Sequence, residues 1–192
     1  MRSNIFTQII LLYQPHCFMA ISTVNFRSFR NLVSRNKRKF RSFLTSLEKK
    51  APRNLHLITL EANELSWAKT DCMDCANCCK TMSPTYSQPD ITRISKFLGM
   101  TRKAFKEKWL YKDRAGDWIN KSQPCQFLDL NTNLCGIYEV RPGDCAGFPH
   151  HSTKKIKDYG HVYKQNVEFC PATYRLVEFM RDGIRNGKWT LK

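Results

Sequence analysis

Eight cysteines carry the clearest chemistry in this sequence. Four of them fall within eight residues, in the run Cys72-Met-Asp-Cys75-Ala-Asn-Cys78-Cys79, and four single cysteines follow at Cys125, Cys135, Cys145 and Cys170. Two-residue spacings allow a tight turn to point successive thiolates at one ion. We therefore predict that all eight of these cysteines are metal ligands.

Disulfides are the alternative explanation for such a density of cysteines. Disulfide scaffolds belong to small secreted domains with little apolar core, whereas this region is rich in Phe, Trp, Leu and Ile at helical spacing. The neighbours Cys78 and Cys79 are also poorly placed to form two independent disulfides. Metal ligation is the interpretation that we favour, and it implies a reducing compartment, the cytoplasm.

The cysteine spacing leaves the metal open between an iron-sulfur cluster and Zn2+. Cys72, Cys75 and Cys78 match the first three positions of the bacterial ferredoxin run, and Cys170-Pro171 is similar to its ending, although Cys79 departs from that run. Zinc accepts the same thiolates. Because closed zinc sites usually combine two Cys-x2-Cys pairs and the later cysteines here are single, the pattern slightly favours iron-sulfur.

The number of metal centres is also open. Side chains at consecutive positions diverge, so Cys78 and Cys79 serve two four-cysteine sites more easily than one. Alternatively, one cluster takes four of the eight cysteines, and the others act as redox or structural thiols. Either arrangement concentrates negative charge, which Lys80 and Arg141 are placed in the sequence to offset. We expect surface or hydrogen-bonded roles, not ligation, for His150, His151 and His161.

The N-terminal part of the chain is strongly basic. Residues 1–53 contain 11 Lys and Arg and a single acid, Glu48. Apolar residues at helical spacing run through 29–47, so this extension is predicted to be a basic amphipathic helix. It either packs on the domain with a solvated outer face or meets a partner, an acidic protein, nucleic acid or a membrane surface.

Residues 1–18 have a separate interpretation. Most of them belong to a fairly apolar run, residues 4–24, that is too short and too interrupted to span a membrane. We interpret them as a disordered leader, or as untranslated if synthesis begins at Met19, in which case Cys17 has no role. An acid-free, Arg-rich start is also typical of an organellar transit peptide, which is the less favoured alternative.

Local signals predict several helices in the remainder of the chain. Residues 54–68 form a short helix or an extended lead-in to the first cysteines. Ser87 is a candidate N-cap for a helix that Gly99 ends, and Thr101 caps a second one. Pro171 opens a C-terminal helix directly after Cys170.

The segment 126–138 has a different period. Gln-Phe-Leu, a turn at 131–133 and Leu-Cys-Gly-Ile-Tyr predict a β-hairpin with cysteines at its edges. The predicted fold class is therefore α+β and mainly helical: a small cysteine-rich metal-binding domain over 54–192 with a short hairpin, preceded by the basic helical extension over 1–53.

Four phrases give the chain a family resemblance. They are the Cys72–Cys79 run, Cys125-Gln-Phe-Leu, Cys135-Gly-Ile-Tyr-Glu-Val-Arg-Pro and Cys145-x2-Phe-Pro. Over about residues 68–176 the chain resembles the YkgJ-like, zinc- or iron-chelating proteins. The resemblance implies a metal or iron-sulfur site and leaves the reaction open. The family commonly has Arg where this chain has Ala146, so the resemblance does not extend to a substrate.

The sequence is compatible with three functions. The favoured one is a cytoplasmic metal-binding protein that holds iron-sulfur or zinc through the eight-cysteine cluster. The second is a redox or protein-modification accessory enzyme that uses the cluster. The third is a nucleic-acid-binding module with a structural zinc and the basic N-terminus as its contact surface. A similar cysteine pattern occurs in flagellin lysine N-methylases, but no cofactor-binding segment for methyl transfer is visible here, and the sequence leaves enzymatic activity open.

Overall fold

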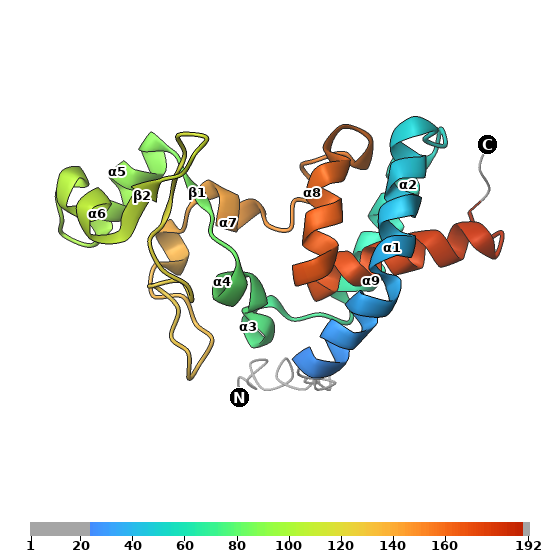
Figure 1. Ribbon diagram of the computed structural model, residues 1–192, viewed down its shortest axis with the longest axis horizontal. Coiled ribbons are helices and arrows are strands. Elements are labelled where there is room, and N and C mark those ends of the chain that lie inside the picture. Colours follow the sequence, from blue (N-terminus) through green and yellow to red (C-terminus); the bar gives the residue numbers. More distant parts are fainter. Residues whose placement is uncertain (1–23, 190–192) are drawn as a thin grey trace, which may run out of the picture.

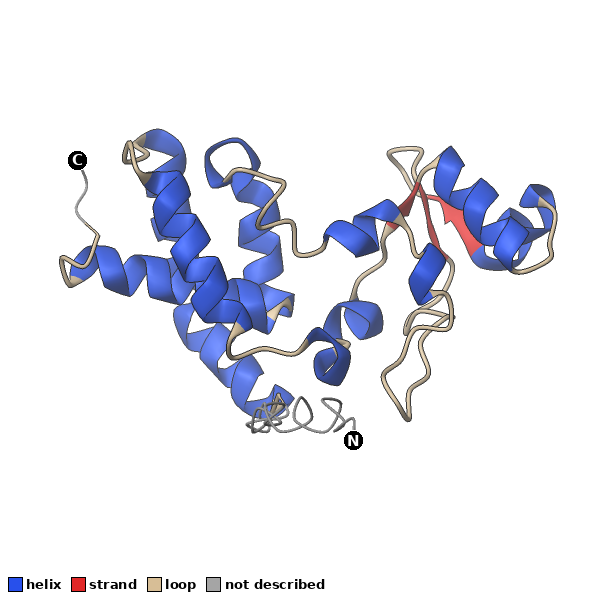
Figure 2. Cartoon of the chain, turned by 180° about the vertical axis from the view of Figure 1, so that it is seen from behind, coloured by secondary structure: helices blue, strands red, loops and turns tan. Residues whose placement is uncertain are grey.

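The computed structural model describes residues 24–189, so the predicted leader 1–18 and Cys17 lie outside the described residues. The larger of two lobes contains α1 (Phe26–Lys49), α2 (Leu55–Trp67), α8 (Ile156–Phe169) and α9 (Pro171–Arg185) (Figure 1). The smaller lobe contains α5 (Gln88–Phe97), α6 (Arg102–Trp109) and a three-stranded sheet. Each lobe has its own hydrophobic core. Three short helices lie between the lobes (Figure 2): α3 (Cys72–Cys75), α4 (Asn77–Thr81) and α7 (Gly143–Gly147).

The helix α1 is amphipathic, as the sequence predicts. The Asn25 side chain caps it by accepting a hydrogen bond from the Ser28 N–H at 3.0 Å. Its buried residues, Phe29, Phe40, Leu44 and Leu47, recur at helical spacing and pack against α8 and α9. α1 therefore belongs to the larger core, whereas the division of the chain at residue 53 stays a prediction.

The helix α8 is the element that the sequence does not predict. Its pattern is interrupted by Gly160, and Tyr159 leaves helical geometry with φ −123° and ψ 30°. A Cβ at position 160 would overlap the side chain of Glu48 in α1. Close packing of α1 on α8 therefore explains a glycine inside this helix.

Caps define the helices of the smaller lobe. Ser87 Oγ accepts the Asp90 N–H at 3.2 Å, and Asp90 Oδ2 accepts the Ser87 N–H at 3.0 Å, which is a complete capping box. Thr101 Oγ1 accepts the Ala104 N–H at 3.1 Å at the start of α6. Gly99, between the two helices, has a φ of +65°. The predicted helix ends are confirmed here.

The β structure differs from the predicted hairpin. The strands β1 (Thr85–Tyr86), β2 (Leu110–Lys112) and β3 (Trp118–Asn120) form an antiparallel sheet in the order β1-β3-β2, with Leu110 opposite Asn120 and Tyr86 opposite Trp118. The segment 126–138 keeps a single antiparallel bridge, Leu128 to Cys135. The mainly helical α+β class is confirmed, but the hairpin is β2–β3, and the hairpin predicted at 126–138 is reduced to the one bridge.

The 3-10 helix η1 (Tyr138–Val140) lies between the Leu128–Cys135 bridge and α7. No helix between residues 24 and 189 is long and apolar enough to cross a membrane.

Candidate metal centre

The first four cysteines form a compact knuckle of two short helices. Asp71 Oδ1 accepts the Met73 N–H at 2.8 Å and caps α3. Ala76, with φ 45° in the left-handed region, separates α3 from α4 and reverses the chain. The Asn77 amide donates to the Phe169 carbonyl at 2.7 Å, which fastens the knuckle to the end of α8, directly before Cys170.

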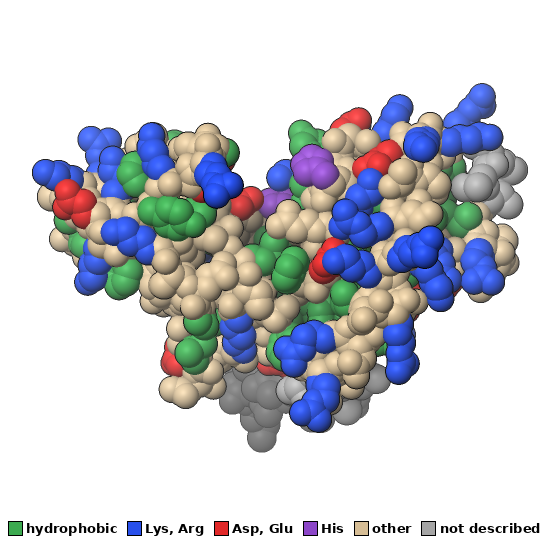
Figure 3. All heavy atoms as spheres, viewed as in Figure 1, with side chains coloured by type: hydrophobic (Ala, Val, Ile, Leu, Met, Phe, Trp, Pro, Cys, Tyr) green, Lys and Arg blue, Asp and Glu red, His purple; other side chains and the backbone are tan. Residues whose placement is uncertain are grey.

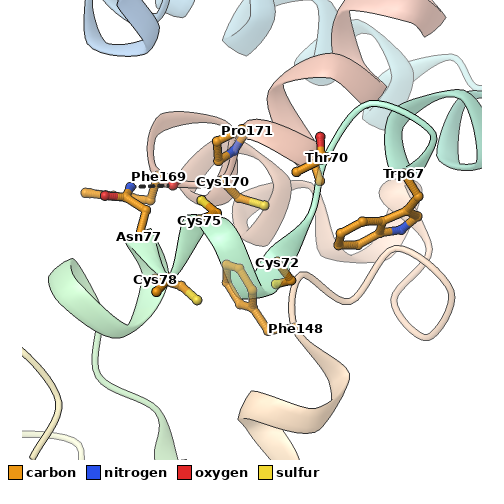
Figure 4. Close-up of a pocket in the computed structure, with 12 residues that line it drawn as sticks. Trp67, Thr70, Cys72, Cys75, Asn77, Cys78, Phe148, Phe169, Cys170 and Pro171 are labelled. Atoms are coloured by element: carbon orange, nitrogen blue, oxygen red, sulfur yellow. Dashed lines mark hydrogen bonds between the residues drawn. The ribbon is translucent and has the colours of Figure 1, made fainter. Parts of the chain in front are cut away.

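Four cysteines surround one cavity at this junction. The cavity contains about 280 Å3 of empty space, part of it open to solvent, and Cys72, Cys75, Cys78 and Cys170 all line it. Figure 4 shows their four sulfur atoms around a common space, with the Phe148 ring beside it. Thiols from three segments, α3, α4 and the α8–α9 junction, therefore line one cavity.

The other four cysteines approach one another on the side of the smaller lobe. The Cys125 N–H donates to the Cys79 carbonyl at 2.8 Å, so Cys125 lies against the knuckle. The Gly136 N–H donates to the Phe127 carbonyl at 2.8 Å, and together with the Leu128 bridge this bond holds Cys135 beside Cys125.

Cys145 reaches the same region through α7. The Gly143 N–H donates to Asp90 Oδ1 at 3.1 Å, and the Thr85 N–H donates to Asp144 Oδ2 at 3.2 Å, so α7 is fixed to α5 and β1. Burial raises the pKa of Cys145, and the thiolate charges of Cys79, Cys125 and Cys135 raise it further. α7 therefore brings Cys145 to the side of the smaller lobe on which α5 and β1 lie.

The eight thiols in residues 24–189 are all free, with none in a disulfide. Cys78 Sγ and Cys79 Sγ lie 3.9 Å apart, so the expected divergence of these neighbours is only partial. As the side chains stand, no three His, Cys, Asp or Glu residues in the described part of the chain are close enough to hold one ion. Because four thiolates on one zinc ion lie about 3.8 Å apart, closing such a site requires several cysteine side chains to rotate inward.

Backbone N–H groups favour the thiolate at several of these cysteines. Burial raises the pKa of Cys75, Cys125, Cys135 and Cys170, and a nearby backbone N–H lowers each pKa again. These N–H groups belong to Asn77 for Cys75, Phe127 for Cys125, Ile137 for Cys135, and Thr173 and then Ala172 for Cys170. Hydrogen bonds of this kind stabilise metal-bound thiolates and tune the metal that they hold.

The neighbouring pair Cys78–Cys79 has unusual acidity. Their sulfur contact raises the pKa of Cys78 and lowers the pKa of Cys79 to about 7. Elsewhere in the cluster burial dominates and raises the pKa of Cys72 to about 11. Metal ligation requires thiolates, so metal binding at these residues displaces protons and weakens as the pH falls.

Lys80 and Arg141 lie where they offset thiolate charge. Burial is the main influence on Cys75 and Cys135 and raises the pKa of both, but the Lys80 ammonium lowers the pKa of Cys75 and the Arg141 guanidinium lowers that of Cys135. Arg141 is held in place by donating to the Tyr138 carbonyl at 2.8 Å and by stacking on the Tyr138 ring.

Asn120 is a candidate supporting residue that the sequence did not single out. Its Oδ1 accepts hydrogen bonds from Tyr86 at 2.7 Å and Gln126 at 2.9 Å. Its Nδ2 is buried with no hydrogen-bond partner assigned among the described residues, and it lies beside Cys125. Burial raises the pKa of the Cys125 thiol, and the Asn120 amide lowers it. A buried donor without a partner beside a thiol suits a thiolate ligand, which would accept its hydrogen bond.

The histidines fill structural roles in the parts of the chain that the structure describes. His151 Nδ1 lies 2.8 Å from Asn63 Oδ1, and its Nε2 lies 2.9 Å from Thr173 Oγ1, so both ring nitrogens are used. His150 Nε2 lies 3.1 Å from Asp144 Oδ1, and His161 is exposed. His150 and His151 therefore have hydrogen-bonded positions and His161 a surface position; that none of them is a metal ligand stays a prediction.

The family comparison accords with this geometry. Residues 71–171 match the model of the CxxCxxCC family, whose description is "Putative zinc- or iron-chelating domain". The chain therefore belongs to the CxxCxxCC family of zinc- or iron-chelating domains. No curated protein and no solved structure matches the chain. The match confirms the resemblance inferred from the cysteine phrases and supports metal binding as the general property of this region.

Proposed function

We propose that this protein is a metal-binding protein of the reducing cytoplasm that holds an iron-sulfur cluster or Zn2+ through eight cysteines. The ligands are Cys72, Cys75, Cys78, Cys79, Cys125, Cys135, Cys145 and Cys170. The observation that carries the proposal is the convergence of eight free thiols, from segments up to 98 positions apart in the sequence, on the region between the two lobes.

The residues present suit such a ligand set. Four thiols face one cavity, backbone N–H groups favour the thiolate at Cys75, Cys125, Cys135 and Cys170, and a buried amide lies beside Cys125. When bound, zinc supplies a redox-silent structural crosslink, whereas an iron-sulfur cluster supplies electron transfer. In either case this chain's residues hold the thiolates in place, with Phe148 lining the cavity beside Cys72, Cys75, Cys78 and Cys170.

The test is an absorbance spectrum with metal and sulfide analysis on the full chain purified without oxygen. Iron and acid-labile sulfide with broad thiolate-to-iron absorbance identify a cluster, and a colourless protein with zinc identifies a structural site. A protein that contains neither metal, and acquires neither on reconstitution with Zn2+ or with iron and sulfide, contradicts the proposal.

A second candidate function rests on the outer face of α1. The side chains of Arg27, Arg30, Arg35, Arg38 and Lys39 are exposed on this helix, while its opposite face is buried in the larger core. Figure 3 shows Lys and Arg side chains spread over this face of the molecule. Because phosphate backbones bind such surfaces through charge, we propose nucleic acid as the partner.

This candidate is tested by charge reversal. The triple variant Arg30→Glu, Arg35→Glu, Arg38→Glu is compared with Lys96→Glu, Arg102→Glu, Lys103→Glu, which has the same net charge but alters exposed positions of the smaller lobe. We expect the α1 variant alone to lose at least tenfold in affinity for random-sequence RNA or duplex DNA, and its salt dependence to fall by roughly 0.9 per lost phosphate contact on duplex DNA. Equal losses in both variants, or no binding by the wild type, would remove this candidate.

A further inference from the structure

We propose that the eight cysteines form two separate four-thiolate metal sites that meet at the neighbouring pair Cys78–Cys79. The first site consists of Cys72, Cys75, Cys78 and Cys170, and the second of Cys79, Cys125, Cys135 and Cys145. This division rests on the proposed metal-binding function and adds to it the number of centres and the membership of each.

The cavity defines the first site. Its lining includes four of the eight cysteines and excludes the other four. The members come from the knuckle and from Cys170, whose position is fixed by the hydrogen bond of Asn77 to the Phe169 carbonyl. Cys78 lines this cavity and Cys79 does not, so the division passes between two consecutive residues (Figure 4).

Hydrogen bonds of the backbone define the second site. The Cys125 N–H donates to the Cys79 carbonyl, and Cys135 forms the isolated antiparallel bridge with Leu128, three residues after Cys125. The buried Asn120 amide serves this group by lying beside Cys125. α7 adds Cys145 from the side of β1 and α5.

The two proposed sites would be immediate neighbours. The sulfur of Cys79 lies 3.9 Å from that of Cys78, and these two consecutive residues belong to different sites.

The division has a structural consequence. The first site joins the knuckle to the α8–α9 junction of the larger lobe, and the second joins the knuckle to the 125–145 segment of the smaller lobe. Each metal would therefore fix one lobe to the same eight residues. The knuckle would act as the shared anchor of the two halves of the molecule.

The test uses two double variants of the full chain: Cys72→Ser/Cys75→Ser in the first site and Cys125→Ser/Cys135→Ser in the second. Cys17→Ser, outside both sets, is the control. Metal and acid-labile sulfide per chain are measured after anaerobic purification and after reconstitution with Zn2+ or with iron and sulfide. Circular dichroism shows which variants retain their helices.

We expect each double variant to keep the metal of the other site, so that the two retained amounts add up to the wild-type content. The variant that combines all four Cys→Ser substitutions should bind no metal, and Cys17→Ser should match the wild type. If one double variant loses all metal while the other loses none, or if both lose all metal while staying helical, a single site exists and the division is wrong. A wild type that binds neither metal would instead overturn the proposed function itself.

Discussion

His151 shows how one buried side chain makes the stability of the protein depend on pH. Burial lowers the pKa of His151 to about 4 from 6.5, since the charged ring would lose its solvation. The unfolded chain binds this proton more readily than the folded one. The contribution of the neutral, buried His151 to stability is therefore fully present above about pH 6.5 and is lost as the pH falls towards 4. We expect a loss of roughly 3 kcal/mol over this range from His151 alone.

The measurement is the free energy of unfolding in urea at several pH values between 7 and 4.5. His151→Gln should flatten this pH dependence relative to the wild type, and His161→Gln, at an exposed position, should leave it unchanged. Comparing slopes at matched metal content removes the part due to thiol protonation. Equal slopes for wild type and His151→Gln would contradict the assignment.

Asn120 offers a second test at the level of one residue. Asn120→Asp keeps the oxygen that accepts hydrogen bonds from Tyr86 and Gln126 but replaces the donor beside Cys125 with a negative charge. We expect the metal affinity, measured by competition with a chelator, to fall by 10- to 100-fold. Asn131→Asp adds the same charge at an exposed position of the turn between Leu128 and Cys135 and should change the affinity little. A similar loss there would argue against a specific role for Asn120.

At the level of elements, the sequence predicts those helices whose ends have local signals. The capping box of Ser87 and Asp90, the Thr101 cap and Pro171 each act within a few residues, so they can be recognised without knowing the tertiary structure. The helix α8 has no side-chain cap hydrogen bond and contains Gly160. Its formation depends on contact with α1, more than 100 positions away in the sequence, which local signals do not contain.

Gly160 allows this explanation to be tested by a double-mutant cycle. Gly160→Ala should destabilise the protein by up to about 1 kcal/mol, because the new Cβ displaces the Glu48 side chain and breaks its 2.6 Å ion pair with Lys164. After Glu48→Ala the same change should be neutral or stabilise by up to about 1 kcal/mol, since alanine favours helix more than glycine does. Urea unfolding of the four proteins gives the coupling, and additive effects would contradict close packing at this point.

At the level of the whole molecule, the sequence identifies the cysteines but not their grouping. Spacing and chemistry are local properties, so the Cys72–Cys79 run can be recognised directly. Which distant thiol joins which part of the run depends on the Asn77–Phe169 and Cys79–Cys125 backbone contacts, which form only in the folded chain. The hairpin predicted at 126–138 is wrong for a similar reason. Turn residues are a local signal, whereas the strand pairing they suggest depends on the folded chain, which keeps one bridge there.

Metal removal should loosen the connection between the lobes before it unfolds them. The larger lobe keeps its own core, from Phe29 to Trp189, without any cysteine, and the smaller lobe keeps a core around Ile91, Ile94 and Phe105. Chelation under reducing conditions should therefore make residues 69–84 and 147–155 sensitive to proteases while much of the helical circular dichroism persists. Unchanged cleavage in the chelated protein would show that the thiols do not hold the lobes together.

Native mass spectrometry of the full chain, purified without oxygen, tests the central claim most directly. We expect a mass above that of the polypeptide by the mass of bound zinc, or of iron and sulfide. This excess should be lost on acidification and should be absent from the variant in which all eight cysteines are replaced by serine. A mass equal to that of the reduced polypeptide, before and after reconstitution with either metal, would contradict it. So would a mass lower by two hydrogens for each disulfide, which would make these cysteines a disulfide framework.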